Sequence, residues 1–426
     1  MSVCNRTLCE AVRCLTLPDT RFKTARITVG LFMPLTPDTV EEQAILPFLL
    51  TRACAAYPDF TALQRRLNRL YGAAVSGDVA RVGETQALLL TAECTADRYA
   101  LHGEHVAADC AALLCEMLFA PALENGIFRE NDVAIEKRCL AQTVAAQINE
   151  KQWYARCQAE KLLCPDDAYS IGRYGEIDRI EALTAERITA AWKRVLREAT
   201  VQILVQDEKE LPLVEETFRR GFSQVEGRAP ARCGTLMHKP SEAVRCIERL
   251  DVNQCKLVMG FATECAGDDR DVPAMRVMSA LLGGTATSLL MKNVREKLSL
   301  CYYCSSQYDR LKGVMFVQSG VEEGQAARTE EEVLRQIENI RAGAFTQAQL
   351  EETRRAMCQA FEGVYDAQAA TGAWYVGQGL AKTLKTPEDV KREIEAVTRE
   401  DVMAAAAKVT LGCVYLLAPK GENADE

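Results

Sequence analysis

The stretch that decides the fold lies in the second half of the chain and runs Leu281-Leu-Gly-Gly-Thr-Ala-Thr-Ser-Leu-Leu-Met-Lys-Asn-Val-Arg-Glu-Lys-Leu-Ser-Leu-Cys-Tyr302. Its two glycines predict a turn, the segment after them predicts a helix, and its end predicts the start of a strand. No Gly-Lys-Ser or Gly-Lys-Thr follows the glycines, so the stretch is not a phosphate-binding loop.

A similar series of elements occurs in the first half of the chain. Leu63-Gln-Arg-Arg-Leu-Asn-Arg-Leu-Tyr71 is the counterpart of the helix that leads to Tyr302. The other matched pairs are 27–33 with 256–263, 41–54 with 272–282, 85–93 with 313–321, 106–119 with 330–340, 128–136 with 345–353, 184–192 with 398–406, and 201–206 with 414–418. Because these pairs follow one another in the same order, we interpret the chain as an internal duplication.

The duplication predicts two homologous domains, 1–225 and 244–420, joined by a linker at 226–243. The linker carries Gly and Pro and lacks apolar periodicity. A chain of 426 residues also suits two domains better than one core. Strands joined by hairpins and interleaved with amphipathic helices predict an α+β fold, in which each domain is a mostly antiparallel sheet with helices on one face.

Composition and charge exclude several classes of function. The net charge of −9 argues against nucleic acid as a partner and mildly favours basic peptides. No run of apolar residues is long enough to span a membrane, and the N-terminus has no apolar signal segment. We therefore expect a cytoplasmic protein without a membrane partner, whose 18 cysteines are reduced thiols.

The stretch from Leu281 to Tyr302 resembles the signature of the insulinase/pitrilysin zinc metallopeptidases: Leu-Gly-Gly, then a Ser-x-Leu helix, then Arg-Glu-Lys-x-x-Leu-x-Tyr. The resemblance implies the duplicated half-clamshell of that family, similar to one subunit of the mitochondrial processing peptidase. It also implies that Arg295 and Tyr302 contact the substrate backbone, and that Gly283 and Gly284 let a ligand approach closely. The alternatives are a solvated arginine, a tyrosine in a strand, and a simple glycine turn.

The zinc motif of the family is missing. Active members carry His-x-x-Glu-His on the first long helix of the first domain, where this chain has Ala44-Ile-Leu-Pro-Phe48. Ala44, Pro47 and Phe48 thus stand at the two histidines and the catalytic glutamate. Of the family's paired glutamates, Glu136 is retained and Thr143 stands at the ligand position. We expect no catalytic residue, metal or cofactor on this chain.

Two other patterns have weaker functional interpretations. His102-Gly-Glu-His105 looks like a shortened zinc motif, but Gly103 disfavours a helix there, so an exposed helix start is the simpler interpretation. Cys301-Tyr302-Tyr303-Cys304 has the spacing of a redox or metal pair, but such a pair is expected at a helix N-terminus or beside a second pair. This segment is instead predicted to be a strand.

The sequence leaves three functional hypotheses. The first is a non-catalytic, substrate-binding subunit that pairs with a zinc-bearing homologous subunit in a heterodimeric metallopeptidase acting on peptides. The second is a structural or peptide-binding protein with no protease partner, which could be a homodimer. The third is an active hydrolase whose metal site has moved to His102 and His105.

Overall fold

The structure is a computed structural model that describes residues 3–420. Six strands form the first sheet, in the order β1-β2-β8-β3-β5-β4, and five form the second, in the order β9-β13-β10-β12-β11. The first sheet comprises β1 (Cys4–Cys9), β2 (Val12–Pro18), β3 (Thr24–Pro34), β4 (Ala74–Val82), β5 (Thr85–Thr95) and β8 (Thr200–Asp207). The second comprises β9 (Val244–Leu250), β10 (Cys255–Ala262), β11 (Cys301–Asp309), β12 (Val314–Val321) and β13 (Thr410–Pro419).

The two sheets confirm the predicted fold class and the duplication. Neighbouring strands are antiparallel except for β2 with β8 and β9 with β13, which are parallel. The series β2-β8-β3-β5-β4 therefore has the same order and directions as β9-β13-β10-β12-β11. Strands β1, β2 and β9 were not predicted from the sequence.

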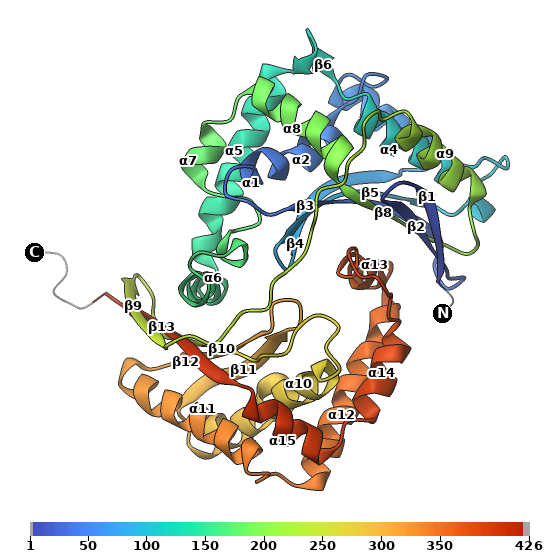
Figure 1. Cartoon of the computed structure of the whole chain (residues 1–426). Helices are drawn as coiled ribbons and strands as arrows, with labels where there is room; N and C mark the ends of the chain where they lie inside the picture. Colours follow the sequence, from blue (N-terminus) through green and yellow to red (C-terminus); the bar gives the residue numbers. More distant parts are fainter. Residues whose placement is uncertain (1–2, 421–426) are drawn as a thin grey trace, which may run out of the picture. The chain divides into compact units, whose positions relative to one another are not determined.

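A layer of helices covers one face of each sheet (Figure 1). On the first sheet the layer comprises α1 (Val40–Ala44), α2 (Leu46–Arg52), α3 (Phe60–Arg69), α4 (Val106–Phe119), α5 (Glu130–Ala146), α7 (Ile177–Glu181), α8 (Ala185–Glu198) and α9 (Pro212–Ser223). On the second it comprises α10 (Val272–Ser279), the π-helical segments Ala280–Gly284 and Leu290–Lys297, α11 (Ala326–Arg341), α12 (Gln347–Glu362), α14 (Pro387–Glu395) and α15 (Arg399–Ala407). Thr184 and Thr398 cap α8 and α15 through their side chains.

The remaining elements are short, apart from two helices described next. A two-stranded ribbon is formed by β6 (Leu123–Glu124) and β7 (Ile127–Phe128). Single 3-10 turns lie at Asp97–Tyr99, Gln147–Asn149, Ala168–Ser170, Glu323–Gln325 and Gly363–Asp366. Residues 226–243 contain no helix or strand. No helix within residues 3–420 is long and apolar enough to cross a membrane.

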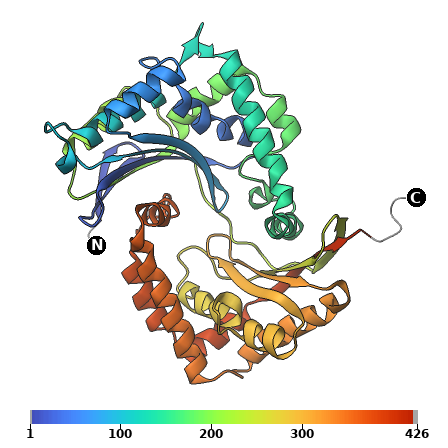
Figure 2. The same cartoon turned by 180° about the vertical axis from the view of Figure 1, so that it is seen from behind.

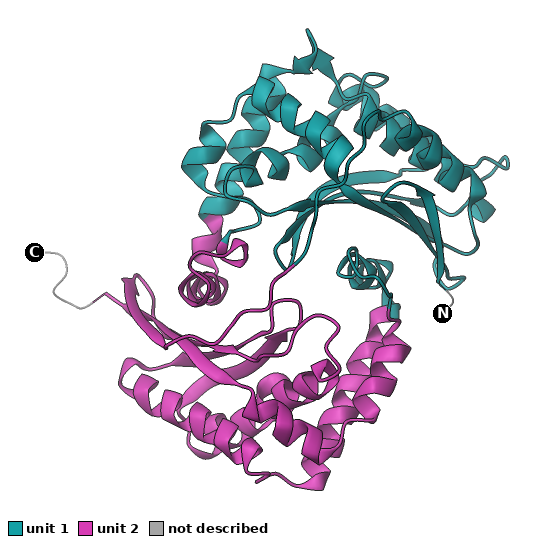
Figure 3. Cartoon of the chain, in the orientation of Figure 1, with its two compact units in different colours: residues 1–145, 171–234, 365–384 teal, residues 146–170, 235–364, 385–426 magenta. Residues whose placement is uncertain are grey.

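The chain is divided into two compact units, and neither is one continuous stretch of sequence (Figure 3). Within the described residues, unit 1 holds 3–145, 171–234 and 365–384, and unit 2 holds 146–170, 235–364 and 385–420. The two inserted segments carry α6 (Lys151–Leu163) and α13 (Gln368–Val376). Each half of the sequence thus contributes one helix to the sheet built by the other half, an arrangement that the predicted domain boundaries did not include.

These two helices cover the second face of each sheet. Helix α13 lies on the face of the first sheet opposite the main helical layer (Figure 2). Its Tyr375 packs against Leu15, Leu17 and Leu204. Helix α6 places Ala155, Ala159 and Leu163 against apolar side chains of β10, β12 and β13. Both faces of each sheet are therefore packed, which extends the prediction of helices on one face only.

A buried ion pair anchors the segment that follows α6 in unit 2. The ammonium group of Lys312 is fully buried and donates to Asp167, and it lies over the ring of Tyr169. The Tyr169 hydroxyl donates to Asp309 at 2.8 Å. Burying a lysine is costly unless it is paired, so these contacts fix the end of the inserted segment in one position.

Candidate functional site

The position of the missing zinc motif lies on a broken helix in unit 1. The predicted helix 41–54 is divided at Ile45 into α1 and α2, and Pro47 lies in the first turn of α2. Proline has no N–H to donate to the carbonyl of Gln43, so a continuous helix would leave that acceptor unpaired. The segment that the resemblance aligns with the zinc motif is therefore two short helices and not one continuous helix.

Apolar packing surrounds the residues that stand at the motif positions. Ala44 is fully buried, Pro47 is buried, and Phe48 packs partly buried against the same core. The carbonyl of Pro47 lies so close to Gly77 of β4 that a Cβ on this glycine would be 2.3 Å from the oxygen. These three side chains have no group that binds a metal or transfers a proton, and their surroundings are filled.

An arginine stands beside the retained glutamate. Arg52 Nε donates to Asp132 Oδ1 and its other nitrogen donates to Glu136 Oε1, both at 2.9 Å. All three side chains are partly buried. Arg52 follows Phe48 by four residues, so the two share one face of α2. Arg52 was not predicted from the sequence as a residue of this site, although its helical spacing from Phe48 was an available signal. The positive charge beside the Glu136 carboxylate is therefore the guanidinium of Arg52.

The predicted ligand position Thr143 is exposed and lies one turn or more from this cluster along α5. Its hydroxyl donates to the carbonyl of Cys139 at 2.9 Å, a bond within the helix. A carboxylate of α1 is also engaged. Glu42 is buried and ion-paired with Arg187 and Arg194, at 2.5 and 2.6 Å.

Arg295 and Tyr302 lie on consecutive elements of unit 2. Arg295 is exposed on the π-helical segment Leu290–Lys297, and among the described residues its guanidinium has no hydrogen-bond partner. Tyr302 is 59% exposed near the start of β11, and its hydroxyl donates to Glu322 Oε1 at 3.3 Å. π-Helical turns are rare and occur often at functional sites. The side chains of Arg295 and Tyr302, which are both hydrogen-bond donors, face solvent on this segment and on the strand that follows it.

The two glycines of the motif differ in their surroundings. A Cβ on Gly283 would lie 2.6 Å from the backbone nitrogen of Ser306, so this glycine allows the π-helical turn to touch β11. Gly283 is buried and Gly284 is exposed. The close approach to β11 is sufficient to explain why residue 283 is a glycine. Gly284, in contrast, is exposed and accessible to a ligand.

The predicted equivalence of Tyr71 and Tyr302 is wrong in register. Tyr302 is the second residue of β11, and the second residue of the corresponding strand β4 is Val75. Tyr71 lies before β4 in a turn with φ of 60°, and its hydroxyl donates to Glu104 at 2.9 Å. The exposed tyrosine is therefore a property of the second half alone.

The shortened motif at His102 and His105 forms no cluster of ligands. Both histidines are exposed in the loop before α4, and Glu104 accepts hydrogen bonds from Tyr71 and from the His102 backbone N–H. His105 faces Asp97 at 3.4 Å. Within residues 3–420, no three His, Cys, Asp or Glu side chains come together in a group that could hold a metal ion.

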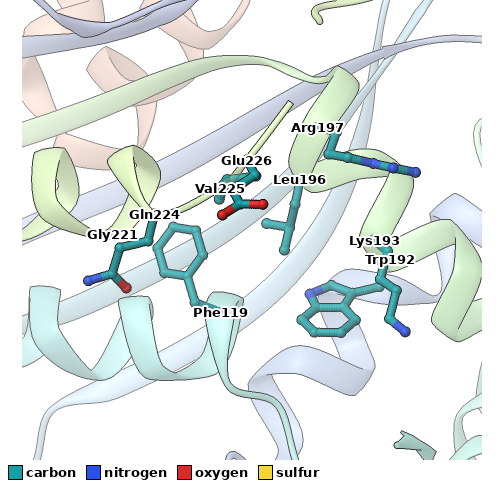
Figure 4. A pocket seen from close by; sticks show the side chains of 9 residues that line it. All are labelled: Phe119, Trp192, Lys193, Leu196, Arg197, Gly221, Gln224, Val225 and Glu226. Atoms are coloured by element: carbon teal, nitrogen blue, oxygen red, sulfur yellow. The ribbon is translucent and has the colours of Figure 1, made fainter. Parts of the chain in front are cut away.

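Two open grooves lie on unit 1, away from the predicted site residues. One, of about 440 Å³, lies between α8 and α9 and is bordered by Phe119, Trp192 and Arg197 (Figure 4). The other, of about 450 Å³, lies between α5 and α7 and is lined by aliphatic parts of residues such as Ala141 and Ile177. Neither contains a set of groups suited to catalysis.

Comparisons with known proteins find a family model and a relative whose descriptions both include the word "inactive". Residues 182–357 match the family model described as "Peptidase M16 inactive domain". The chain is 28% identical over 397 residues to a Bacillus subtilis protein named "Probable inactive metalloprotease YmfF", covering 93% of each sequence.

Solved structures with the same fold include two bacterial proteins of matching length. A conserved protein from Enterococcus faecalis superposes with a TM-score of 0.89 at 24% identity, covering 99% of both chains. A structure described as a peptidase M16 inactive domain, from Pseudomonas fluorescens, superposes with a TM-score of 0.79 at 17% identity, also over 99% of both chains. These likenesses concern the fold of the whole chain.

Proposed function

We propose that this chain, which belongs to the M16 peptidase family and is homologous to a probable inactive metalloprotease, is the non-catalytic, peptide-binding subunit of a dimeric zinc peptidase. Its partner would be a homologous chain that carries His-x-x-Glu-His. The observation that supports this is an asymmetry between the units. Ala44 and Pro47 are buried in unit 1, whereas Arg295 and Tyr302 face solvent in unit 2.

The exposed pair is suited to hold a peptide backbone. A guanidinium and a phenol both donate hydrogen bonds to a carbonyl, and the guanidinium can hold two acceptors at once. Because Arg295 has no partner among the described residues, binding a peptide would not require it to give up an ion pair. Bond cleavage would be the work of zinc-bound water on the partner, and this chain would position the substrate.

The overall charge favours a basic or neutral peptide as the substrate. A chain with a net charge of −9 raises the local concentration of cationic ligands and repels acidic ones. The substrate would be an extended peptide or a small unfolded polypeptide, because hydrogen bonds to backbone carbonyls require an exposed backbone.

Isolation of the full-length protein from its native host tests the pairing. We expect a chain with His-x-x-Glu-His to copurify, and the isolated pair to cleave peptides in a zinc-dependent way. Arg295→Ala should lower kcat/KM of the pair by about tenfold or more, since a lost hydrogen bond from a charged group costs about 1.5–3 kcal/mol. Tyr302→Phe should have a smaller effect of the same sign.

Matched variants separate this outcome from a general loss of structure. Arg270→Ala removes an exposed arginine of unit 2, and Tyr99→Phe removes an exposed phenol of unit 1. Both should leave cleavage unchanged. If no zinc-bearing homologue copurifies but the chain alone binds peptides through Arg295, it is a peptide-binding protein without a protease partner. Equal effects of Arg295→Ala and Arg270→Ala would contradict the role of the exposed pair.

A further inference from the structure

Strand β9 lies at an edge of the second sheet, and the corresponding edge of the first sheet is covered. The series β9-β13-β10-β12-β11 matches β2-β8-β3-β5-β4, and β1 pairs antiparallel with the outer edge of β2. Among residues 3–420, no strand pairs with the outer edge of β9 (Figure 1). The first sheet thus shows which kind of element fits beside β9, namely an extended antiparallel strand.

The hydrogen bonds between β9 and β13 identify the free backbone groups of β9. The carbonyl of Leu250 accepts a hydrogen bond from the N–H of Lys420 at 3.1 Å, so the backbone groups of Leu250 point toward β13. Along a strand, the backbone groups of successive residues point alternately to the two edges. The N–H and carbonyl groups of Arg245, Ile247 and Arg249 therefore point away from β13, and in the described part of the chain they have no partner.

Side-chain contacts hold β9 in place and leave this edge open. Arg245 donates to both carboxylate oxygens of Glu330 on α11, at 2.7 and 2.6 Å. On the opposite face of the sheet, Glu248 accepts a hydrogen bond from Tyr154 of α6 at 2.7 Å. The pairing with β13 is regular throughout β9, and β9 contains no proline. Two features that often protect edge strands from pairing, a bulge and a proline, are therefore absent from β9.

The side chains along the free edge indicate the chemistry of a partner strand. Ile247 is 63% exposed, so an aliphatic side chain opposite it would remove apolar surface from water. The side chains of Arg245 and Arg249 are 60% and 48% exposed, although each has a glutamate partner. Opposite charges across a strand pair are stabilising, and like charges are destabilising. We therefore expect carboxylates opposite the two arginines and an aliphatic residue between them.

Strand β9 of a second copy of the chain does not have this chemistry. A symmetric antiparallel pair centred on Ile247 would place Arg245 of each copy opposite Arg249 of the other. Moving the centre by one residue in either direction would place Ile247 opposite an arginine. Each of these pairings brings arginines together or leaves the isoleucine without an apolar partner, so the residues of β9 favour a strand of different sequence.

We propose that the free edge of β9 is an interaction surface that binds an extended segment of a partner protein as an additional antiparallel strand. The segment has an aliphatic residue opposite Ile247 and acidic residues two positions before and after it. Main-chain hydrogen bonds supply the affinity, and the alternating side chains supply the specificity. Strands β9 and β11 lie at opposite edges of the sheet, so this surface is separate from Tyr302 and does not depend on the proposed peptidase subunit.

The test titrates the folded, full-length protein into a fluorescein-labelled, amidated peptide Thr-Glu-Thr-Val-Thr-Glu-Thr and follows the fluorescence anisotropy. The valine lies opposite Ile247, so its N–H faces β9, whereas the N–H of the threonine before it faces away. N-methylation of the valine should weaken binding by about tenfold or more, and N-methylation of that threonine by about twofold or less. This comparison uses the unmodified chain, so it does not depend on the folding of any variant. Equal or reversed effects of the two N-methyl groups would overturn the proposal.

Variants of β9 locate the bound peptide. Ile247→Pro removes an N–H that points away from β13, so it should weaken binding by about tenfold or more while the sheet stays intact, and Ile247→Val is the control that keeps this N–H. The double variant Arg245→Gln and Arg249→Gln should weaken binding of the glutamate peptide by about threefold or more, and should not weaken binding of the same peptide with glutamines in place of its glutamates. Arg270→Gln removes an exposed arginine elsewhere in unit 2 and should change neither affinity.

Two further outcomes would contradict the proposal. The absence of saturable binding of the glutamate peptide at millimolar concentration would show that the edge of β9 does not accept such a strand. A dimer in analytical ultracentrifugation that Ile247→Pro converts to a monomer would identify a second copy of the chain as the occupant of this edge.

Discussion

The position of the lost zinc motif in unit 1 and the exposed motif of unit 2 have opposite surroundings. Ala44 and Pro47, at the positions where the resemblance places zinc-motif residues, are buried, and the Pro47 carbonyl lies close to Gly77 of β4. Around Arg295 and Tyr302 two polar side chains face solvent. Burial of the former adds apolar contacts to the core, whereas exposure of a phenol and a guanidinium adds little to stability. The comparison shows an apolar, buried surrounding in one unit and exposed polar side chains in the other.

Restoring the zinc motif should have the largest effect on stability. The triple variant Ala44→His, Pro47→Glu and Phe48→His places polar groups where Ala44 is fully buried. We expect a loss of about 3–5 kcal/mol in the free energy of unfolding, because these groups have no partners in the core. Urea denaturation measures the loss, and equilibrium dialysis should detect no stoichiometric zinc.

Two exposed alanines of α5 provide the control for this variant. Ala134→His and Ala145→His add imidazoles at exposed helix positions and should change the unfolding free energy by about 0.5 kcal/mol or less. A triple variant that is as stable as its parent and binds one zinc would show that the site in unit 1 is merely substituted, not repacked.

The next effect concerns a glycine in each unit. A Cβ on Gly77 would lie 2.3 Å from the Pro47 oxygen, and one on Gly283 would lie 2.6 Å from the Ser306 nitrogen. Gly77→Ala and Gly283→Ala should each cost about 1–3 kcal/mol by overpacking. Thermal denaturation compares them with Gly172→Ala, where no atom lies within 4 Å of the added methyl group. A neutral Gly283→Ala would favour ligand approach over packing as the reason for that glycine.

Removing the guanidinium beside Glu136 should have an intermediate effect. Arg52→Ala leaves Asp132 and Glu136 partly buried without their shared cation. We expect a loss of about 1–2 kcal/mol, between the values of exposed and buried ion pairs. A double-mutant cycle with Glu136→Gln measures the coupling directly, and the exposed Arg270→Ala is the control. A coupling of zero would mean that Arg52 and Glu136 are only neighbours.

The smallest effect on stability is expected at the exposed pair. Arg295→Ala and Tyr302→Phe should each change the unfolding free energy by about 0.5 kcal/mol or less, as usual for surface positions. Denaturation of both variants beside the parent protein measures this. A loss of more than 2 kcal/mol at either residue would identify it as structural and remove the contrast between the units.

Much of the architecture follows from local sequence patterns. The apolar spacing between Val106 and Phe119 predicts α4 with the bounds that the structure has, and the predicted strand 85–93 lies within β5. Thr184 and Thr398 were recognisable as caps because threonine before an acidic first turn satisfies the free backbone donors. The order of such elements was sufficient to reveal the duplication.

Other features depend on contacts that no local pattern specifies. Strand β9 is mostly exposed, so it lacks the alternation that marks a half-buried strand. Pro47 is a signal for the break at Ile45, but the apolar residues on both sides of it led to the prediction of one continuous helix. The irregular pairing of β11 with β12 at Tyr302 depends on the register of the two strands. The partners of Arg52, Asp132 and Glu136, lie on α5, far from it in the sequence. These features depend on contacts between residues that are far apart in the sequence, and the periodicity of a local segment carries no information about such contacts.

The exchange of α6 and α13 has a consequence for how the chain acquires its structure during synthesis. When residues 3–234 have left the ribosome, the face of the first sheet that carries Leu15, Leu17 and Leu204 still lacks its cover. That cover, α13, is made only after most of unit 2. Neither half is complete until the C-terminal part has been translated, so the nascent chain exposes an apolar surface that chaperones would bind. Both units are therefore completed only near the end of synthesis.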